Sequence, residues 1–106
     1  MLKNISNDSL LTLAIPVGLE EDVLDFLLLH PLWATGFSVL AAQGMGQGAV
    51  LQSPMELVQG RSGRKLVLVA GVGDHLLLLL EALACEIPSP EVTYWLGPLT
   101  ACGRLA

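Results

Sequence analysis

The sequence AAQGMGQGAVLQSPMELVQGRSGRK, from Ala41 to Lys65, divides the chain into two similar halves. It carries three glycines within five residues near its start and three of the five basic residues near its end. On either side of it, the pattern of apolar residues indicates a strand, a helix and a strand. We therefore expect a long loop at about residues 43–63 that joins the two halves of one domain, which is a common location for binding residues.

The first half begins with a short apolar run, Leu10–Ile15, which proline and glycine close. A run of this length indicates a buried strand rather than a helix. Leu19–His30 is a predicted helix, because three carboxylates occupy its first turn, where they complement the helix dipole, and Pro31 ends it. Gly36–Ala42 is the second predicted strand.

In the second half, Arg64–Ala70 predicts a third strand whose unbroken apolar centre implies burial. Asp74 is placed to cap a helix from His75 to about Glu86, which carries more leucines than one helix face can bury. Glu91–Leu96 is β-branched and aromatic and predicts the fourth strand. Within the loop, Ser53–Glu56 has a capping-box pattern that would open a short helical turn.

The order βαββαβ predicts an α+β fold of the ferredoxin-like type, with a four-stranded antiparallel sheet and two helices on one face. The 106 residues form a single domain, 1–106. Because 53% of them are hydrophobic and the mean hydropathy is +0.65, we expect the other sheet face to be covered by a subunit interface. A dimer or a trimer with its sheets inward would provide this cover.

The charge excludes one class of partner. The net charge of −5 and a pI near 4.7 argue against nucleic-acid binding, which needs a basic surface.

Cys85 and Cys102 form no CxxC pair, so we expect two reduced thiols. The polar N-terminus shows no signal peptide, and the uncharged stretch Phe26–Met55 is broken by proline and glycines before it could span a bilayer, which predicts a cytoplasmic protein.

Arg61, Arg64 and Lys65 form the only cationic cluster in the sequence, and an arginine fork suits a carboxylate or phosphate ligand. The alternative is a solvated start of a strand that protects a sheet edge. Gly44 and Gly46 have a spacing found in dinucleotide fingerprints, but no helix follows directly, so we expect a flexible connection there instead.

No local metal site is evident, because His30 and His75 have no ligating residue three or four positions away. A structural or surface role is expected for both. Metal binding across a subunit interface stays open, since Cys85, Cys102, Met45 and Met55 carry soft ligands. The sequence has no GxSxG and no HExxH, and we predict that the protein is not an enzyme.

Several segments together resemble a PII-like family known as domain-of-unknown-function family 3240. The segments are LLTLAIP, LEEDVLDFLLLHP, the GF pair at Gly36, SPMELVQGR with Arg64, the YW pair at Tyr94 and the terminal GRL. This resemblance implies a ferredoxin-like homotrimer related to PII signalling proteins and to CutA-like divalent-ion tolerance proteins. It also implies ligand clefts between subunits and an association with heavy-metal efflux pumps.

Carried over by position, the resemblance places Gln43, Gly44 and Gly46 at the base of the loop, and Arg61, Arg64 and Arg104 as cations of the cleft. PII proteins carry a glycine- and lysine-containing phosphate loop before the last strand, whereas this chain has the acidic segment Glu86–Glu91. We therefore do not expect adenine nucleotides to bind in the usual PII manner.

Two functional hypotheses follow. The first is a regulatory trimer of the cytoplasm that senses a small ligand or a metal ion and modulates a membrane transporter such as a heavy-metal efflux pump. The second is a metal-binding or metal-buffering protein of the CutA-like type, for which His30, His75, Met45 and Cys102 are the candidate ligands. The sequence does not identify a cofactor.

Overall fold

The computed structural model describes residues 3–4, 6–44 and 62–106. The main elements follow the predicted order, with a short 3₁₀ helix added before the first α-helix. They are β2 (Ser9–Pro16), η1 (Val17–Leu19), α1 (Glu20–Leu28), β3 (Phe37–Gly44), β4 (Ser62–Gly71), α3 (Gly73–Glu86) and β5 (Thr93–Pro98). Two further strands, β1 (Lys3–Asn4) and β6 (Gly103–Arg104), lie near the termini.

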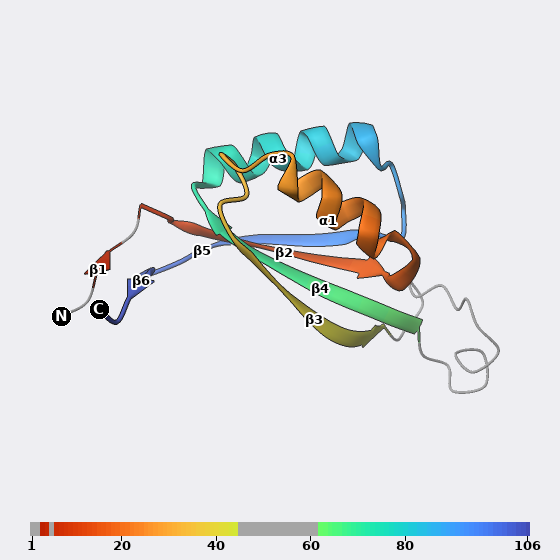
Figure 1. Cartoon of the computed structure of the whole chain (residues 1–106), viewed down its shortest axis with the longest axis horizontal. Helices are drawn as coiled ribbons and strands as arrows, with labels where there is room; N and C mark the ends of the chain where they lie inside the picture. The colour runs from red at the N-terminus through yellow and green to blue at the C-terminus, as the bar shows by residue number, and fades with distance from the viewer. Residues whose placement is uncertain (1–2, 5, 45–61) are drawn as a thin grey trace.

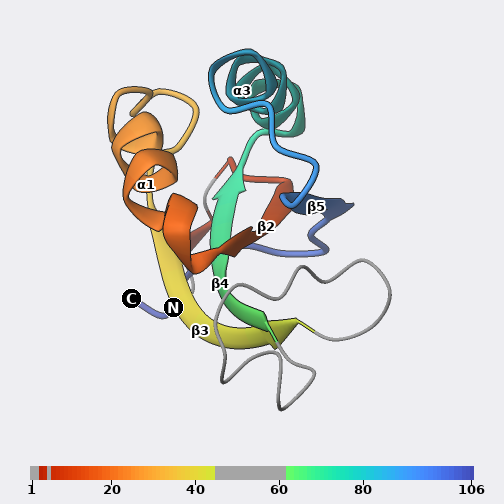
Figure 2. The same ribbon diagram turned by 90° about the vertical axis from the view of Figure 1, so that its right-hand side faces the viewer.

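The strand order of the main sheet is β3-β4-β2-β5, and all three pairings are antiparallel. Both helices lie on the same face of this sheet, with α1 over the β3 side and α3 over the β5 side (Figure 1, Figure 2). The predicted ferredoxin-like α+β fold is confirmed. The loop was predicted at residues 43–63, but β3 continues to Gly44 and β4 already begins at Ser62. The rest of the predicted loop, including the helical turn predicted at Ser53–Glu56, lies outside the described residues.

The core lies between the sheet and the two helices. Alternate residues of β2 and β4 point toward the helices, as the two-residue period of a strand requires. Leu79 and Leu27 are fully buried there, and burial of one such side chain contributes about 1.5–3 kcal/mol. The other buried members are Leu11, Leu13, Ile15, Val23, Phe26, Ala34, Val67, Val69, Leu76 and Leu83.

The surplus leucines of α3 reach the surface, as the sequence predicted. Leu76, Leu79 and Leu83 recur every three or four residues and form the buried stripe, while Leu77 and Leu78 are about half exposed, at 51% and 45%. No helix of the described residues is long and apolar enough to cross a membrane.

The opposite face of the sheet is apolar, and none of the described helices lies over it. Residues paired in register lie on the same face of a sheet. Thr12 of β2 pairs with Trp95 of β5 and with Leu68 of β4, and all three belong to this open face. Trp95 is 56% exposed. Other apolar residues that the register places here are Leu10, Ala14, Leu40, Ala42, Leu66 and Ala70. We call this surface the open sheet face.

The predicted cap of the second helix was wrong. Asp74 lies in the first turn of α3, and no side chain of the N-cap residue Val72 makes a cap hydrogen bond. The carboxylate of Asp8 instead accepts hydrogen bonds from the Gly73 amide at 2.8 Å and from the Ser9 hydroxyl at 3.0 Å. The Gly73 amide lowers the pKa of Asp8 below its ordinary value, because the hydrogen bond favours the charged carboxylate.

Gly73 must stay small for this contact. A β-carbon at Gly73 would lie 2.9 Å from the Ser9 hydroxyl oxygen, which is too close without a shift of that side chain. The backbone of Asp8 also donates to the Gly71 carbonyl and accepts from the Leu99 amide. Asp8 therefore connects the start of β2 to the start of α3 and to the chain after β5.

The last residues form a strand that the sequence analysis did not predict. Gly103 and Arg104 of β6 pair antiparallel with Asn4 and Lys3 of β1. This two-stranded arm extends away from the main sheet and brings the two termini together at one end of the molecule (Figure 1). The pairing is only two residues long on each strand, which leaves too little periodicity for the sequence to reveal it.

Candidate functional site

Arg64 is the most unusual polar residue of the described part of the chain. Its side chain is only 8% exposed, and its Nη1 atom is buried without a hydrogen-bond partner there. Arg64 lies in β4 on the open sheet face, where its register partners are Pro16 of β2 and Ala42 of β3. A buried guanidinium nitrogen without a partner is costly, so the Nη1 atom is available to an anion.

The neighbouring cation, Lys65, does not join Arg64. Consecutive residues of a strand point to opposite faces, and the Nζ atom of Lys65 lies 3.6 Å from a carboxylate oxygen of Glu20 on the helix side. Both side chains are about 30% exposed, at 29% and 30%, so this ion pair is a solvated one. The sequence cluster is thus divided by the sheet.

Arg104 lies at the other end of the molecule. Arg64 pairs with Pro16, which is the last residue of β2. The first residue of β2, Ser9, pairs with Pro98 at the end of β5. Arg104 comes after Pro98 in the chain and lies in the arm beyond that end of the sheet (Figure 1). Within one chain, Arg64 and Arg104 therefore do not form a common site. Both could contribute to one site only if a second copy brought its arm to the first.

The base of the predicted loop lies next to Arg64. Gln43 pairs in register with Gly63, and Gly44 pairs with Ser62, so both predicted base residues continue the strand pair that carries Arg64. The other predicted residues of the loop, Gly46, Met45 and Arg61, lie outside the described residues. Of these two, Gly44 shares the open sheet face with Arg64, whereas Gln43 pairs with Gly63 and belongs, like Lys65, to the helix side.

The candidate metal ligands His30, His75 and Cys102, which the structure describes, are not part of any metal-binding group. His30 stacks parallel to Trp33, with ring centroids 5.3 Å apart. The ring centroids of His30 and Phe26 lie 4.5 Å apart. His75 is exposed at the start of α3. Both cysteines are free thiols, and in the described ranges no group of three or more histidine, cysteine, aspartate or glutamate residues could hold a metal ion.

A cavity of about 520 Å³ lies between the start of α1 and the segment that follows α3. Its lining includes the carboxylates of Asp22, Glu86 and Glu91 and no lysine or arginine. Such a lining repels phosphate groups. The acidic segment that the sequence analysis singled out therefore lines a cavity of the wrong charge for a nucleotide.

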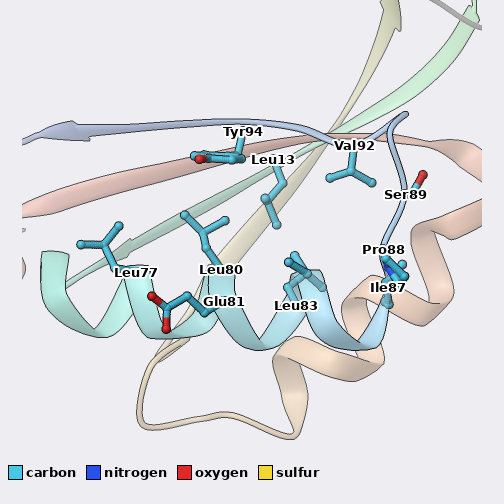
Figure 3. A pocket seen from close by; sticks show the side chains of 11 residues that line it. Leu13, Leu77, Leu80, Glu81, Leu83, Ile87, Pro88, Ser89, Val92 and Tyr94 are labelled. Atoms are coloured by element: carbon cyan, nitrogen blue, oxygen red, sulfur yellow. The ribbon is translucent and has the colours of Figure 1, made fainter.

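A larger groove of about 610 Å³ lies between α3 and β5 (Figure 3). Leu80 and Leu83 of α3 face Tyr94 and Val92 across it, and Leu13 of β2 lines it as well. Sequence reasoning did not predict this groove. The only available signal was the excess of leucines on α3, which indicated exposed apolar surface but not its position.

The family model of proteins described as "Protein of unknown function (DUF3240)" matches residues 5–106. The chain belongs to this family. No curated protein is detectably similar to it in sequence. The resemblance that the sequence segments carried is thereby confirmed.

Three solved structures illustrate the neighbours of this DUF3240 chain. A DUF3240 family protein from Shewanella baltica OS155 has a TM-score of 0.72 at 22% identity, covering 96% of this chain and 100% of its own. A nitrogen regulatory PII-like protein, CPII from Thiomonas intermedia K12, bound to ADP, AMP and bicarbonate, has a TM-score of 0.66 at 14% identity, covering 93% and 96%. CutA from Synechococcus elongatus PCC7942 has a TM-score of 0.67 at 15% identity, covering 96% and 85%.

These similarities establish that the DUF3240 chain has the fold shared by PII-like and CutA proteins. At such low identities they do not transfer a ligand or a partner to it.

Proposed function

We propose that this DUF3240 protein is a non-enzymatic, PII-like regulatory protein of the cytoplasm that acts as a homotrimer. It would sense a small anionic ligand at Arg64 and thereby modulate a membrane transporter, such as a heavy-metal efflux pump. The observation that carries the proposal is the buried guanidinium of Arg64, whose Nη1 atom has no partner among the described residues.

The energetics of Arg64 favour an anion as its ligand. Leaving a buried hydrogen-bonding group without a partner costs about 1–3 kcal/mol, and more if the group is charged. An anion that binds there removes this cost and adds a charge-assisted hydrogen bond, which is about twice as strong as a neutral one. Binding would therefore stabilise the β3–β4 strand pair. The predicted loop begins and ends at this strand pair.

The open sheet face supports the proposed assembly. Its side chains include the half-exposed Trp95 and Leu40, and the only charged residue that the register places on this face within the described strands is Arg64. Contiguous exposed apolar surface of this kind is typical of subunit interfaces. The choice of a trimer over a dimer rests on the family resemblance.

A small anion is favoured over a nucleotide as the ligand. The cavity lined by Asp22, Glu86 and Glu91 is acidic, so it offers no counter-charge to a polyphosphate. The CPII neighbour is described as bound to bicarbonate as well as to ADP and AMP. Bicarbonate and ADP are therefore the two probes that separate these ligand classes.

The experiment combines native mass spectrometry for the subunit number with isothermal titration calorimetry for binding. Wild-type protein is expected to be a trimer that binds bicarbonate more tightly than ADP. Arg64→Met should weaken bicarbonate binding at least about tenfold, because hydrogen bonds to charged groups contribute about 1.5–3 kcal/mol. Lys65→Met is the matched control, since Lys65 is adjacent to Arg64 in sequence but lies on the helix side. The Lys65→Met variant should bind bicarbonate as tightly as the wild type.

The outcomes discriminate between the hypotheses. Equal anion binding by wild type and Arg64→Met would reject Arg64 as the ligand site, and a monomeric wild type would reject the assembly. Stoichiometric uptake of Zn(II) or Cu(I) that survives Arg64→Met would favour the metal-buffering alternative. Co-purification with an efflux pump from membranes that depends on bicarbonate would support the proposed transporter partner.

A further inference from the structure

The side of α1 that faces away from the sheet ends in an exposed apolar patch. Val23 and Leu27 belong to the stripe of α1 that is buried against the sheet. Leu28, in contrast, is 66% exposed, and Leu29 and Leu32 are more exposed still. The fold therefore leaves three neighbouring leucines in contact with solvent, and an exposed apolar patch of this kind marks a surface for association.

A cavity of about 510 Å³ adjoins this patch along the flank of α1, and Leu28 contributes to its lining. Glu20 also lines the cavity and pairs with Lys65, whereas no salt bridge within the described ranges involves Glu21 or Asp25. The lining contains apolar and acidic residues and no lysine or arginine: Val17, Glu20, Glu21, Leu24, Asp25 and Leu28. The site is thus an apolar hollow with carboxylates beside it.

The apolar and acidic residues form two rows along the helix. Leu24 and Leu28 are four residues apart, which places them one above the other on the helix surface. Glu21 and Asp25 have the same spacing and form the neighbouring row. A second helix that lies along these rows can pack apolar side chains on the leucines while its basic side chains approach the carboxylates.

Charge distinguishes between the possible occupants. A second copy of this chain offers few free cations among its described residues, because Arg64 is buried and Lys65 already pairs with Glu20. The carboxylates of Glu21 and Asp25 also repel an anionic lipid surface. In addition, α1 and the open sheet face lie on opposite sides of the sheet, so an assembly through the open sheet face leaves the patch uncovered (Figure 1, Figure 2).

We propose that this side of α1 binds a basic amphipathic helix of a partner protein. Apolar side chains of that helix pack on Leu24 and Leu28, and its lysine or arginine side chains lie near Glu21 and Asp25. The site is on the helix side of the sheet, whereas Arg64 is on the open sheet face. Because its test also needs no bicarbonate, this proposal stands or falls independently of the anion site.

The probe is a capped peptide of about 14 residues, about 21 Å long as a helix, in which leucine recurs every three or four positions and lysine fills the others. It is titrated into the full-length protein and followed by calorimetry and by NMR of the backbone amides of α1. We expect saturable binding that shifts these amides. A scrambled peptide of the same composition has the same charge but no apolar face, and it should bind at least about tenfold more weakly.

Two pairs of variants test the residues. Leu28→Gln should weaken binding of the amphipathic peptide about five- to thirtyfold, because the exposed 66% of this side chain is what the partner would bury. Leu78→Gln is the matched control, since Leu78 is an exposed leucine of α3, and this variant should bind as the wild type does.

Asp25→Lys should weaken binding about two- to fivefold, the range expected for exposed charges. Glu81→Lys makes the same change of charge on α3 and should leave binding unchanged. All four substituted residues are exposed, so the variants are expected to fold.

Four results would overturn the proposal. Binding of the scrambled peptide as tight as that of the amphipathic one would show that charge alone attracts it. Equal effects of Leu28→Gln and Leu78→Gln would place the peptide elsewhere. A changed subunit number of Leu28→Gln in native mass spectrometry would show that the patch is an interface between copies. Binding to phosphatidylcholine vesicles that Leu28→Gln abolishes, and with which the peptide does not compete, would identify a lipid surface as the occupant.

Discussion

The substitution Arg64→Met tests the central physical argument through the stability of the ligand-free protein. Methionine keeps an apolar stem between Pro16 and Ala42 but removes the guanidinium, including the buried Nη1 atom, which has no partner in the part of the chain that the structure describes. Removing such a group should recover about 1–3 kcal/mol of unfolding free energy. For a domain of this size, each kcal/mol corresponds to roughly 4 °C in Tm, so a rise of roughly 4–12 °C is expected.

The assay is thermal unfolding followed by circular dichroism, with bicarbonate-free buffer, and urea unfolding of the same samples. All proteins are compared at the same subunit concentration, because association adds to the apparent stability. Lys65→Met is the control and should lose about 0.2–1 kcal/mol, since it removes only the partly exposed ion pair with Glu20. The two neighbouring substitutions are therefore predicted to change stability in opposite directions.

A loss of stability in Arg64→Met would refute the reasoning. It would show that the guanidinium already has its hydrogen bonds in the ligand-free protein and serves the fold or the assembly. A gain of stability together with a loss of bicarbonate binding is the combination that identifies a site at which stability is sacrificed for function.

Three further predictions concern the scaffold and the assembly. Asp8→Ala should lower the unfolding free energy, because the ionised Asp8 stabilises the Gly73 amide. This loss should be constant above about pH 4 and should vanish as the pH falls through the lowered pKa of the native carboxyl. Urea unfolding between about pH 2 and 7 checks this dependence. Leu79→Ala should cost about 2–5 kcal/mol in the same assay and Leu78→Ala less than about 1 kcal/mol, because only Leu79 is fully buried. Trp95→Glu should leave the chain folded but dissociate the oligomer in native mass spectrometry, whereas an intact trimer would exclude the open sheet face as the interface.

The elements themselves were predictable, because their signals are local. The apolar run at Leu10–Ile15, the acidic helix start at Glu20 and the turn at Gly71 each report a backbone preference that neighbouring residues decide. The predicted strands lie within the observed ones except at the starts of β3 and β5, where the predictions begin one and two residues too early. The arm of β1 and β6 was missed because two-residue strands carry no period.

The candidate site was only partly predictable. Arg64 and Lys65 were grouped because they are adjacent in sequence, but the alternation of a strand sends them to opposite faces. Arg104 was grouped with them by family resemblance, and the antiparallel path of β2, β4 and β5 carries it to the other end of the molecule. Whether a second copy reunites these cations is a property of the assembly.

The sequence by itself determined the fold class, the acidic character of the chain and the surplus of apolar surface, since composition and periodicity are properties of the sequence. Only the tertiary structure decided that the Nη1 atom of Arg64 is buried without a partner among the described residues, that Asp8 rather than Asp74 holds the start of α3, and that Tyr94 borders a groove. Each of these depends on which residues distant in sequence the sheet brings together. Burial and hydrogen bonding between such residues are set by three-dimensional packing, for which local patterns carry no signal.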